Sequence, residues 1–453
     1  MYRQNDLITM KTNMDYIKDE AMKKKLDTLE PTLKEFNEVY AIIVDYIKRK
    51  NKIIYGGYAQ NHLIKLKNKD DVFYKDSDLA DIEFYSYEPL KDVVDLCDLL
   101  HSKGFKYVQG TDGVHPETYK IFVNFQNYCD LSYMPKNVYD NVPYILDDGI
   151  RYTHPHFMLV DAFRVYSDPL TSYFRLDKTF NRFTTLIKYY PFDKSFEKNK
   201  VEYNTKLSPD ELKTIKRFVR HKLLHNSQFI VIGHYAYNYL VKKVEHLKLE
   251  IDNFTYYQAV STNYEEDKEL IKKFLIETYG KDIEIKNFTP YFQFYDAHTE
   301  YYYKNTCIFK LYGHNNRCIV NSFSEKKEVF FGTFQLIFLY LLIDYQYAKT
   351  NRNKVEENNY MIMITRLLKA REYYLDKHDI TILDKSPFQE FTLQCLGSTE
   401  DPLRMAFLKR KEKKDAGKQI VFRYDPKGKP GTVPIFRFDN TSGNEILNKN
   451  IQV

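Results

Sequence analysis

The sequence lacks the features of membrane and secreted proteins. Its most apolar stretch, residues 336–343, ends at Asp344 and is far too short to span a membrane. The first twenty residues contain no apolar segment of the kind found in a secretory signal. From these absences we expect a soluble, intracellular protein.

Cysteines and common catalytic motifs are also scarce. No C-x-x-C pair occurs, which argues against a disulfide framework and against a zinc site and makes a reducing compartment the default. The five cysteines are Cys97, Cys129, Cys307, Cys318 and Cys395. The sequence has no G-x-S-x-G, P-loop or H-E-x-x-H pattern, so it gives no support to the enzyme classes that those motifs mark.

The composition is that of a globular protein rich in aromatic rings. Of 453 residues, 43% are hydrophobic and 29% are charged, and a chain of this length is expected to form two or three domains. There are 41 Tyr and 32 Phe but no Trp. The net charge of +6 favours a polyanionic partner only mildly.

A strand, a glycine turn and a helix occur twice along the chain. The first copy follows a predicted helix over residues 32–48, and the second follows a predicted helix that begins at Ser208. The sequence "GGYAQNHLIK" aligns with "GHYAYNYLVK", which places Gly56 on Gly233. A weaker match farther on places Asp81 on Tyr256, Glu83 on Gln258 and Ser86 on Ser261. The pattern predicts a duplicated α/β unit whose second copy has lost its acids.

Three carboxylates stand out in the first copy. In the strand-like run "DLADIEFYS", Asp81 and Glu83 share one face because side chains alternate along a strand. Asp130, in "NYCDLSYMP", lies on the second strand of a predicted hairpin. Three acids suit a divalent cation with oxygen ligands, whereas an exposed acidic edge strand is the alternative. In the second copy we place Ile308 near the Asp130 position.

Two further features could bind phosphate. Gly56 and Gly57 lie at a strand-to-helix turn, where free N–H groups and the helix dipole attract anions, although a plain tight turn would look the same. Arg175, Lys178 and Arg182 are spaced to lie on one helix face. A triphosphate or an RNA backbone would fit them, and a solvated basic face is the alternative.

The rest of the chain is predicted to be largely helical. Residues 153–190 read as two helices broken at Pro169, and residues 334–374 read as two more. The charge run at residues 409–414 and the turn-forming "YDPKGKPGTVP" predict a mobile or loosely attached C-terminal segment.

The order of glycine pair, acid-x-acid pair and lone Asp is that of the nucleotidyltransferase superfamily of the DNA polymerase β type. The segments "IIYGGYAQN", "DIEFYS", "YCDLSYMPKN" and "YSDPLTSYFRLDKTFNRF" closely resemble the catalytic poly(A) polymerases of large cytoplasmic DNA viruses. The likeness covers residues 30–330, is strongest to the giant-virus branch and is weaker to the poxvirus relatives. One departure is Glu83, because the superfamily more often has Asp-x-Asp.

The resemblance implies an α/β (α+β) fold with two nucleotidyltransferase-like domains in tandem, the second degenerate. We expect six segments: an N-terminal helical segment (1–50), the catalytic domain (51–150), a connecting helical region (151–207), the degenerate domain (208–333), a helical segment (334–396) and a basic, turn-rich C-terminal segment (397–453).

The resemblance also implies an activity, the template-independent addition of AMP from ATP to RNA 3′ ends. Asp81, Glu83 and Asp130 would be the catalytic metal ligands for two Mg²⁺ or Mn²⁺ ions, with Asp130 nearest the attacking hydroxyl. The nucleotide-binding residues would be Gly56, Gly57, Arg175, Lys178 and Arg182. A CCA- or U-adding enzyme and a non-catalytic RNA-binding or processivity subunit are the alternatives.

The expected partners are RNA and ATP, with no membrane. The resemblance leads us to expect a homodimer, although the sequence does not decide between self-association and a separate processivity partner. The expected location is the viral factory in the host cytoplasm, and the resemblance leaves a place in the virion open.

Overall fold

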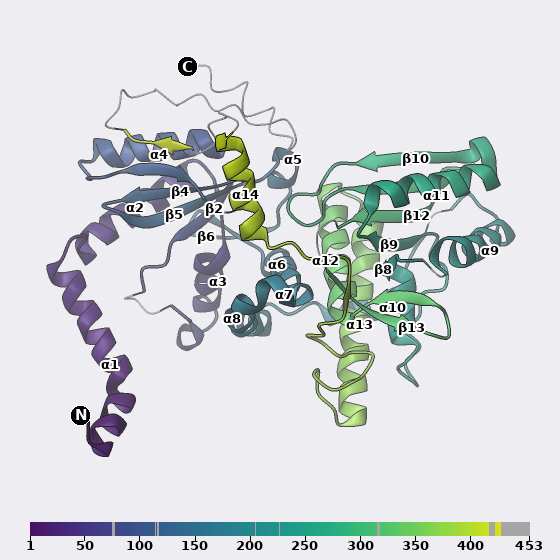
Figure 1. Cartoon of the computed structure of the whole chain (residues 1–453), viewed down its shortest axis with the longest axis horizontal. Coiled ribbons are helices and arrows are strands. Elements are labelled where there is room, and N and C mark those ends of the chain that lie inside the picture. Colours follow the sequence, from purple (N-terminus) through teal and green to yellow (C-terminus); the bar gives the residue numbers. More distant parts are fainter. Residues whose placement is uncertain are drawn as a thin grey trace. The chain divides into compact units, whose positions relative to one another are not determined.

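The computed structural model describes residues 1–74, 78–113, 115, 117–203, 205–225, 227–314, 318–415 and 422–426. The chain divides into two compact units (Figure 1). Unit 1 contains Met1–Tyr139, Pro143–His154 and the described part of Leu403–Val453, and unit 2 contains Asp140–Val142 and Pro155–Pro402. Within the described ranges, no helix combines the length and the apolar character needed to cross a membrane.

Unit 1 begins with two helices, α1 (Gln4–Thr28) and α2 (Leu33–Arg49). The Thr32 hydroxyl accepts a hydrogen bond from the Glu35 backbone N–H, which caps α2 and explains why this helix starts where the sequence pattern predicted. Its apolar face buries Phe36, Val39 and Ile43.

An eight-stranded mixed sheet forms the centre of unit 1. Its strand order is β16-β3-β4-β5-β2-β1-β7-β6. The strands are β1 (Ile53–Tyr55), β2 (Ile82–Ser86), β3 (Gln109–Asp112), β4 (Thr118–Val123), β5 (Gln126–Tyr133), β6 (Tyr144–Asp147), β7 (Ile150–Thr153) and β16 (Arg423–Tyr424). The predicted hairpin around Asp130 is confirmed as the antiparallel pair β4 and β5.

The helices of unit 1 include α3 (Gly56–Lys65), α4 (Pro89–Ser102) and α5 (Lys136–Tyr139). Helices α2 and α4 contact the central strands, whose apolar side chains Ile82, Phe84 and Leu131 are fully buried. Because side chains alternate along β2 and β5, Glu83 and Asp130 point to the other face of the sheet.

Unit 2 is rich in helices, as the sequence predicted. The helices are α6 (Pro155–Ser167), α7 (Pro169–Ser172), α8 (Leu176–Tyr189), α9 (Pro209–Phe218), α10 (Gly233–Val241), α11 (Tyr264–Tyr279), α12 (Phe334–Thr350) and α13 (Lys354–His378). The break at Pro169 is present, and Ser208 and Glu211 form the predicted capping box at the start of α9.

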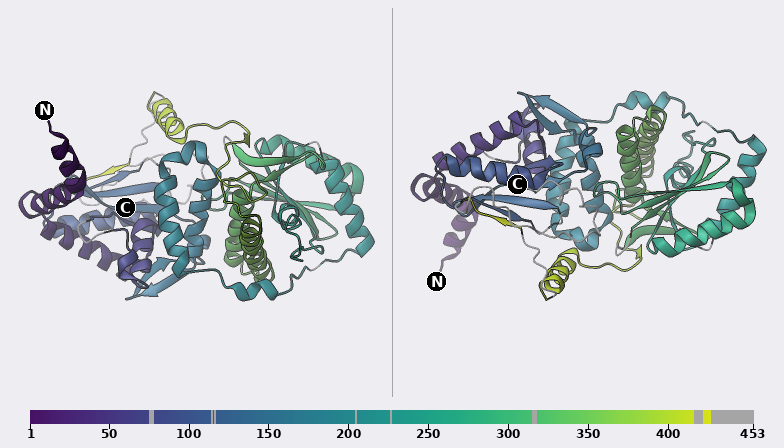
Figure 2. Two further views of the ribbon diagram at one scale, coloured as in Figure 1. Left: turned by 90° about the horizontal axis from the view of Figure 1, so that it is seen from below. Right: turned by 90° about the horizontal axis from the view of Figure 1, so that it is seen from above.

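The sheet of unit 2 repeats the architecture of the first. Its order is β10-β11-β12-β9-β8-β14-β13-β15. The strands are β8 (Ile230–Ile232), β9 (Tyr257–Ser261), β10 (Ile283–Phe288), β11 (His298–Tyr303), β12 (Thr306–Gly313), β13 (Ile319–Ser324), β14 (Val329–Gly332) and β15 (Cys395–Leu396). Figure 2 shows α12 and α13 on one side of this sheet and α11 on the other.

Strand register confirms the repeat that the sequence predicted. Tyr55 pairs with Glu83 in unit 1, and Ile232 pairs with Gln258 in unit 2, as the alignment of Gly56 with Gly233 requires. One side-chain hydrogen bond is also repeated: the Ser86 hydroxyl donates to Asp92 in unit 1, and the Ser261 hydroxyl donates to Asp267 in unit 2. The fold class with two mixed α/β sheets is therefore confirmed.

Register corrects one position of the predicted alignment. Glu83 pairs with Asp130, and its counterpart Gln258 pairs with Lys310, so Lys310 and not Ile308 occupies the Asp130 position. The sequence alignment missed this by two residues because it had no strand pairing to fix the register.

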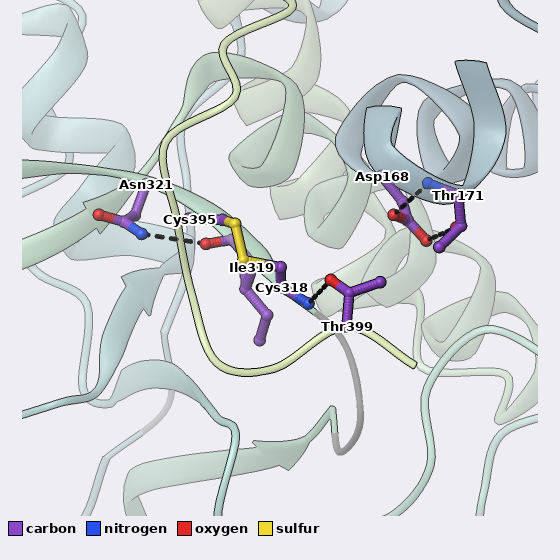
Figure 3. Close-up of a disulfide and its surroundings, with 7 residues drawn as sticks. All are labelled: Asp168, Thr171, Cys318, Ile319, Asn321, Cys395 and Thr399. Carbon is purple, nitrogen blue, oxygen red and sulfur yellow. Dashed lines mark hydrogen bonds between the residues drawn. A yellow bond between two sulfur atoms is a disulfide. The ribbon is translucent and has the colours of Figure 1, made fainter. Parts of the chain in front are cut away.

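The sequence argued against a disulfide framework, and two of the five cysteines nevertheless form a pair. Cys318 and Cys395 form a disulfide that joins the start of β13 to β15 (Figure 3). The Cys318 N–H also donates to the Thr399 hydroxyl at 3.0 Å. The two cysteines are separated by 77 residues, so no local spacing could reveal the pair. Within the described ranges, no group of His, Cys, Asp and Glu is arranged as a metal site.

Part of the C-terminal segment is ordered against unit 1. Helix α14 spans Pro402–Asp415, and β16 pairs with β3 through Arg423 and Tyr424. The Tyr424 hydroxyl donates to the Asp98 carboxylate. Most of the predicted turn-forming stretch lies outside the described residues.

Candidate active site

Two of the predicted acids lie at the start of β2. Asp81 directly precedes the strand and Glu83 is its second residue, and both side chains are half-buried while Ile82 between them is fully buried. The Tyr40 hydroxyl donates to the Ala80 carbonyl, which holds the segment just before Asp81. The chain thus presents two carboxylates on one face of the sheet, as the alternation predicted.

The glycine turn touches one of these acids. The Gly57 backbone N–H donates to Oε2 of Glu83 at 2.8 Å. Gly56 has φ of +69°, and a Cβ there would lie 1.8 Å from the same oxygen. Only glycine allows this approach, because it tolerates a positive φ and leaves room for the carboxylate. The structure therefore brings Gly56, Gly57 and Glu83 together.

Asp130 completes the set from the neighbouring strand. It pairs directly with Glu83 across parallel β2 and β5, and only 14% of its side-chain surface is exposed. The Lys120 ammonium, on β4, forms an ion pair with its carboxylate. Lys120 balances the charge of Asp130, and the sequence showed no sign of it because residues 120 and 130 are seen to lie opposite each other only from the hairpin register.

A second missed residue, Asn127, links two of the acids. Its Nδ2 donates to Oδ2 of Asp81 at 3.3 Å and to Oδ1 of Asp130 at 3.0 Å. Its Oδ1 is buried and has no hydrogen-bond partner among the described residues. The amide therefore lies between the carboxylates, with an unsatisfied oxygen beside them.

The three carboxylates act together on a thiol behind them. Burial raises the pKa of Cys129 well above its ordinary value, and the negative charges of Asp130, Asp81 and Glu83 raise it further. Cys129 is fully buried, and the raised pKa favours its neutral thiol form.

The oxygen donors at this edge fit hard divalent cations. Carboxylates and an amide oxygen are the groups that Mg²⁺ and Mn²⁺ prefer, and the unpartnered Asn127 oxygen is an additional acceptor. The acids do not converge on one point in this arrangement, since Lys120, Asn127 and the Gly57 N–H engage their oxygens. If a metal ion replaced these three groups, the carboxylate oxygens would be free to bind it.

The predicted basic trio belongs to the other unit. Arg175 ends a short 3₁₀ turn (Tyr173–Arg175), and Lys178 and Arg182 lie on α8. Arg175 and Lys178 are exposed, and Arg182 is half-buried. Lys178 and Arg182 therefore share one helix, whereas Arg175 lies in the turn before it, so the three do not lie on one helix as predicted. None of them belongs to the unit that holds the carboxylates.

The corresponding edge of unit 2 has different chemistry. Gln258 and Lys310 replace Glu83 and Asp130, and both are buried. Gln258 Nε2 donates to Oδ2 of Asp344 on α12 at 2.6 Å, and Lys310 Nζ lies 2.9 Å from Glu300 Oε1. The helices on this face fill the position where unit 1 has half-exposed acids.

Comparison with known protein families agrees with this arrangement. A family model described as "Poly(A) polymerase catalytic subunit" matches residues 41–172, which include all three acids. A second model, described as "APMV, Putative poly(A) polymerase, catalytic subunit, C-terminal", matches residues 184–453. Together they match parts of both units.

Individual relatives give the same result. The chain is 34% identical to a putative poly(A) polymerase catalytic subunit of Acanthamoeba polyphaga mimivirus, over 98% of this chain and 83% of the relative. It is 26% identical to the putative poly(A) polymerase catalytic subunit of African swine fever virus (isolate Pig/Kenya/KEN-50/1950), over 44% of this chain and 42% of that protein.

A crystal structure matches across both units. It is that of the Megavirus polyadenylate synthase, with a TM-score of 0.91 and 33% identity, covering 98% of this chain and 92% of the other. The resemblance inferred from the four motifs is confirmed. The chain belongs to the family of poly(A) polymerase catalytic subunits, in its giant-virus branch.

Proposed function

We propose that this chain adds AMP from ATP to the 3′ ends of RNA without a template, and that unit 1 carries the reaction. The observation that carries the proposal is the edge formed by Asp81, Glu83 and Asp130 beside the Gly56–Gly57 turn, in a chain of the poly(A) polymerase family. Membership in that family implies a nucleotide substrate and a divalent metal.

Asp81, Glu83 and Asp130 would hold the metal, as Mg²⁺ or Mn²⁺. When bound, such ions lower the pKa of an attacking hydroxyl and neutralise charge on the phosphates. In the chain itself, Lys120 balances the charge of Asp130 and Asn127 keeps Asp81 and Asp130 close together. These two residues keep the acids in position while no cation is bound.

Glu83 has a further role in the proposal. Its carboxylate now accepts the Gly57 N–H at the start of α3. If Glu83 turns toward a cation, that N–H becomes available to a phosphate oxygen at a helix N-terminus. Metal binding and phosphate binding would then be coupled through one side chain.

We further propose that Arg175, Lys178 and Arg182 bind phosphates of ATP or RNA. The support is their succession along one segment, where three positive charges can meet the negative charges of neighbouring phosphates. The check is the KM for ATP and the affinity for RNA of Arg182→Gln, with Lys188→Gln on the same helix as the matched control.

The choice among nucleotides separates the proposal from its alternatives. Purified chain is mixed with a labelled RNA primer, Mg²⁺ or Mn²⁺, and each of ATP, UTP, CTP and GTP in turn. Long products with ATP alone support a poly(A) polymerase. Products with UTP, or two C and one A, point to a U- or CCA-adding enzyme, and no product with any nucleotide points to a non-catalytic RNA-binding subunit.

Two finer points rest on the family resemblance. We propose a homodimer that acts in the cytoplasm of an infected host cell. Analytical ultracentrifugation at the concentrations used for activity tests the first point, and a monomer there would remove it. Fractionation of infected cells tests the second.

A further inference from the structure

Five cations gather on one surface of unit 2, in the π-helical turn Val219–Leu224, just after helix α10, and in the turn between β13 and β14. Four of them are exposed and Lys327 is half-buried. None of the five forms an ion pair with a described residue, and they are named here as the basic face: Arg220, Lys242, Lys243, Lys326 and Lys327.

Lys327 lies at the centre of the basic face. Its ammonium is 4.9 Å from the ring centre of Tyr235, 5.2 Å from that of Tyr239 and 5.6 Å from that of Phe331. Burial lowers the pKa of Lys327, and the other four cations lower it further. Repulsion among five like charges is a cost that a bound polyanion would remove.

Unit 1 provides an internal comparison, because it has the same pair of stacked rings at the same place. His62 and Tyr152 stack with centres 4.1 Å apart, and their counterparts Tyr239 and Phe331 stack at 4.1 Å. In unit 1 the neighbouring turn is acidic, with Asp147 Oδ2 2.9 Å from His62 Nε2 and Asp148 Oδ1 3.3 Å from Lys48 Nζ.

In unit 2 the corresponding turn carries Lys326 and Lys327. It also contains Glu325 and Glu328, and Glu328 is already paired with His225 at 2.7 Å. The fold therefore works with either sign of charge above the stacked rings, so the fold itself does not require the cations of unit 2.

The basic face continues into a hollow. Lys243 lines a cavity of about 180 Å³ together with Tyr373, Tyr374, Lys377 and His378. The rings of Tyr374 and His378 are 4.4 Å apart, and Glu245 in the wall pairs with Lys377 at 3.4 Å. Rings interleaved with lysines are the combination that binds single-stranded nucleic acid, since bases stack on rings and phosphates meet cations.

We propose that the basic face binds the phosphate backbone of RNA upstream of the 3′ end that reacts. The proposal rests on the proposed function, which makes RNA the polyanion that this chain meets. The degenerate unit would then hold the transcript or the growing tail between additions. Retention of RNA would raise the number of AMP residues added per encounter and leave the transfer step itself unchanged.

The test is a double charge reversal at two exposed members, Lys242→Glu with Lys326→Glu. Affinity for a fluorescent oligo(A) of about 30 nucleotides is measured by anisotropy across a salt series. We expect the Kd at low salt to rise about tenfold or more, and the slope of log K against log salt to become shallower by roughly 1.4, because each lost phosphate contact on a single strand contributes about 0.7.

Activity on saturating RNA provides the second readout. The rate of the first AMP addition should stay within about twofold of wild type, whereas products made under single-encounter conditions should be shorter. The matched control is Lys273→Glu with Lys281→Glu, two exposed lysines of the same unit that have no place in the basic face. It should behave as wild type in both assays.

An affinity and salt slope equal to those of the control would overturn the proposal. If the double reversal loses its circular dichroism signal, Lys242→Gln with Lys326→Gln replaces it, with a smaller expected loss of affinity and the same change in slope. Failure of the proposed function looks different, because wild type would then extend no primer even though the binding comparison could still be made.

Discussion

The two units share one fold but differ in the charge and exposure of the residues at one edge of the sheet. Each has a strand, a glycine with positive φ and a helix, and in each the glycine leaves room for a side chain from the next strand, Glu83 in one and Gln258 in the other. What differs is the charge and exposure at the sheet edge. In unit 1 the Lys120–Asp130 pair is partly open, whereas in unit 2 the Glu300–Lys310 pair is buried with its signs exchanged.

The exchange of signs shows which property belongs to the fold and which to the chemistry. A cross-strand ion pair survives in both units, so the framework accepts a pair of either orientation there. At this edge the three carboxylates of unit 1 are partly exposed, whereas Gln258 and Lys310 of unit 2 are buried. In unit 2, the Gln258 amide donates hydrogen bonds to the Tyr312 hydroxyl and to Asp344, and the Tyr312 hydroxyl donates to Asp344. These bonds close the edge.

The largest expected effect comes from exchanging the two equivalent residues. Glu83→Gln should lower the rate of AMP addition about a thousandfold, on the order of 4 kcal/mol, because a neutral amide holds a divalent ion poorly. Stability should change little, since the amide oxygen can still accept the Gly57 N–H. Single-turnover kinetics and chemical denaturation on the same samples measure both.

Gln258→Glu, the reverse exchange, should create no activity. It places a second carboxyl against buried Asp344 and should instead destabilise unit 2. If Glu83→Gln were as active as wild type, or Gln258→Glu more active, the assignment of roles to the two units would be wrong.

The ion pairs offer the second comparison. Lys310→Met leaves buried Glu300 without its lysine, although the Tyr302 hydroxyl still donates to it, and should lower the free energy of unfolding by about 3 to 5 kcal/mol. Lys120→Met removes a cation that is 29% exposed and should cost about 1 kcal/mol or less. Urea denaturation measures the free energy of unfolding of both variants. Equal losses of stability would show that the two sheet edges are equally closed to solvent.

The third comparison depends on pH. Burial raises the pKa of Asp344 from 3.8 to about 6, so the folded protein holds this proton more tightly than the unfolded chain does. The contribution of Asp344 to stability therefore falls as the pH rises from about 4 to about 6. Asn cannot lose a proton, so the stability of Asp344→Asn relative to wild type should rise by about 3 kcal/mol across that window and then level off.

Denaturant titrations of wild type and Asp344→Asn at several pH values measure this difference. A difference that stays flat from about pH 4 to pH 7 would mean that Asp344 is charged in the folded protein throughout. Unit 2 would then be more open to solvent than its buried residues indicate.

The smallest expected effect concerns the repeated serine bond. Ser261→Ala removes the hydroxyl that Asp267 accepts and should cost about 1 kcal/mol. Ser86→Ala should cost less, because Asp92 keeps Lys52 at 2.5 Å and the Tyr46 hydroxyl at 2.7 Å. Thermal unfolding of both variants shows which one loses more stability, and a larger loss for Ser86→Ala would contradict the prediction.

Much of this arrangement could be predicted from the sequence because it depends on local periodicity. Alternation put Asp81 and Glu83 on one face, and the glycine turn was visible as a repeat that register confirmed. Lys120, Asn127 and Lys310 could not be found, since each acts across strands and is located only by pairing. The disulfide between Cys318 and Cys395 was hidden for the same reason.

The central claim is that the carboxylates of unit 1 perform the transfer. The most direct measurement is extension of a labelled RNA by ATP with wild type and Asp81→Ala, with RNA affinity determined on the same preparations. The account predicts that Asp81→Ala binds RNA as wild type does and adds no AMP. A variant that still makes long tails would contradict it and would move the reaction away from this edge.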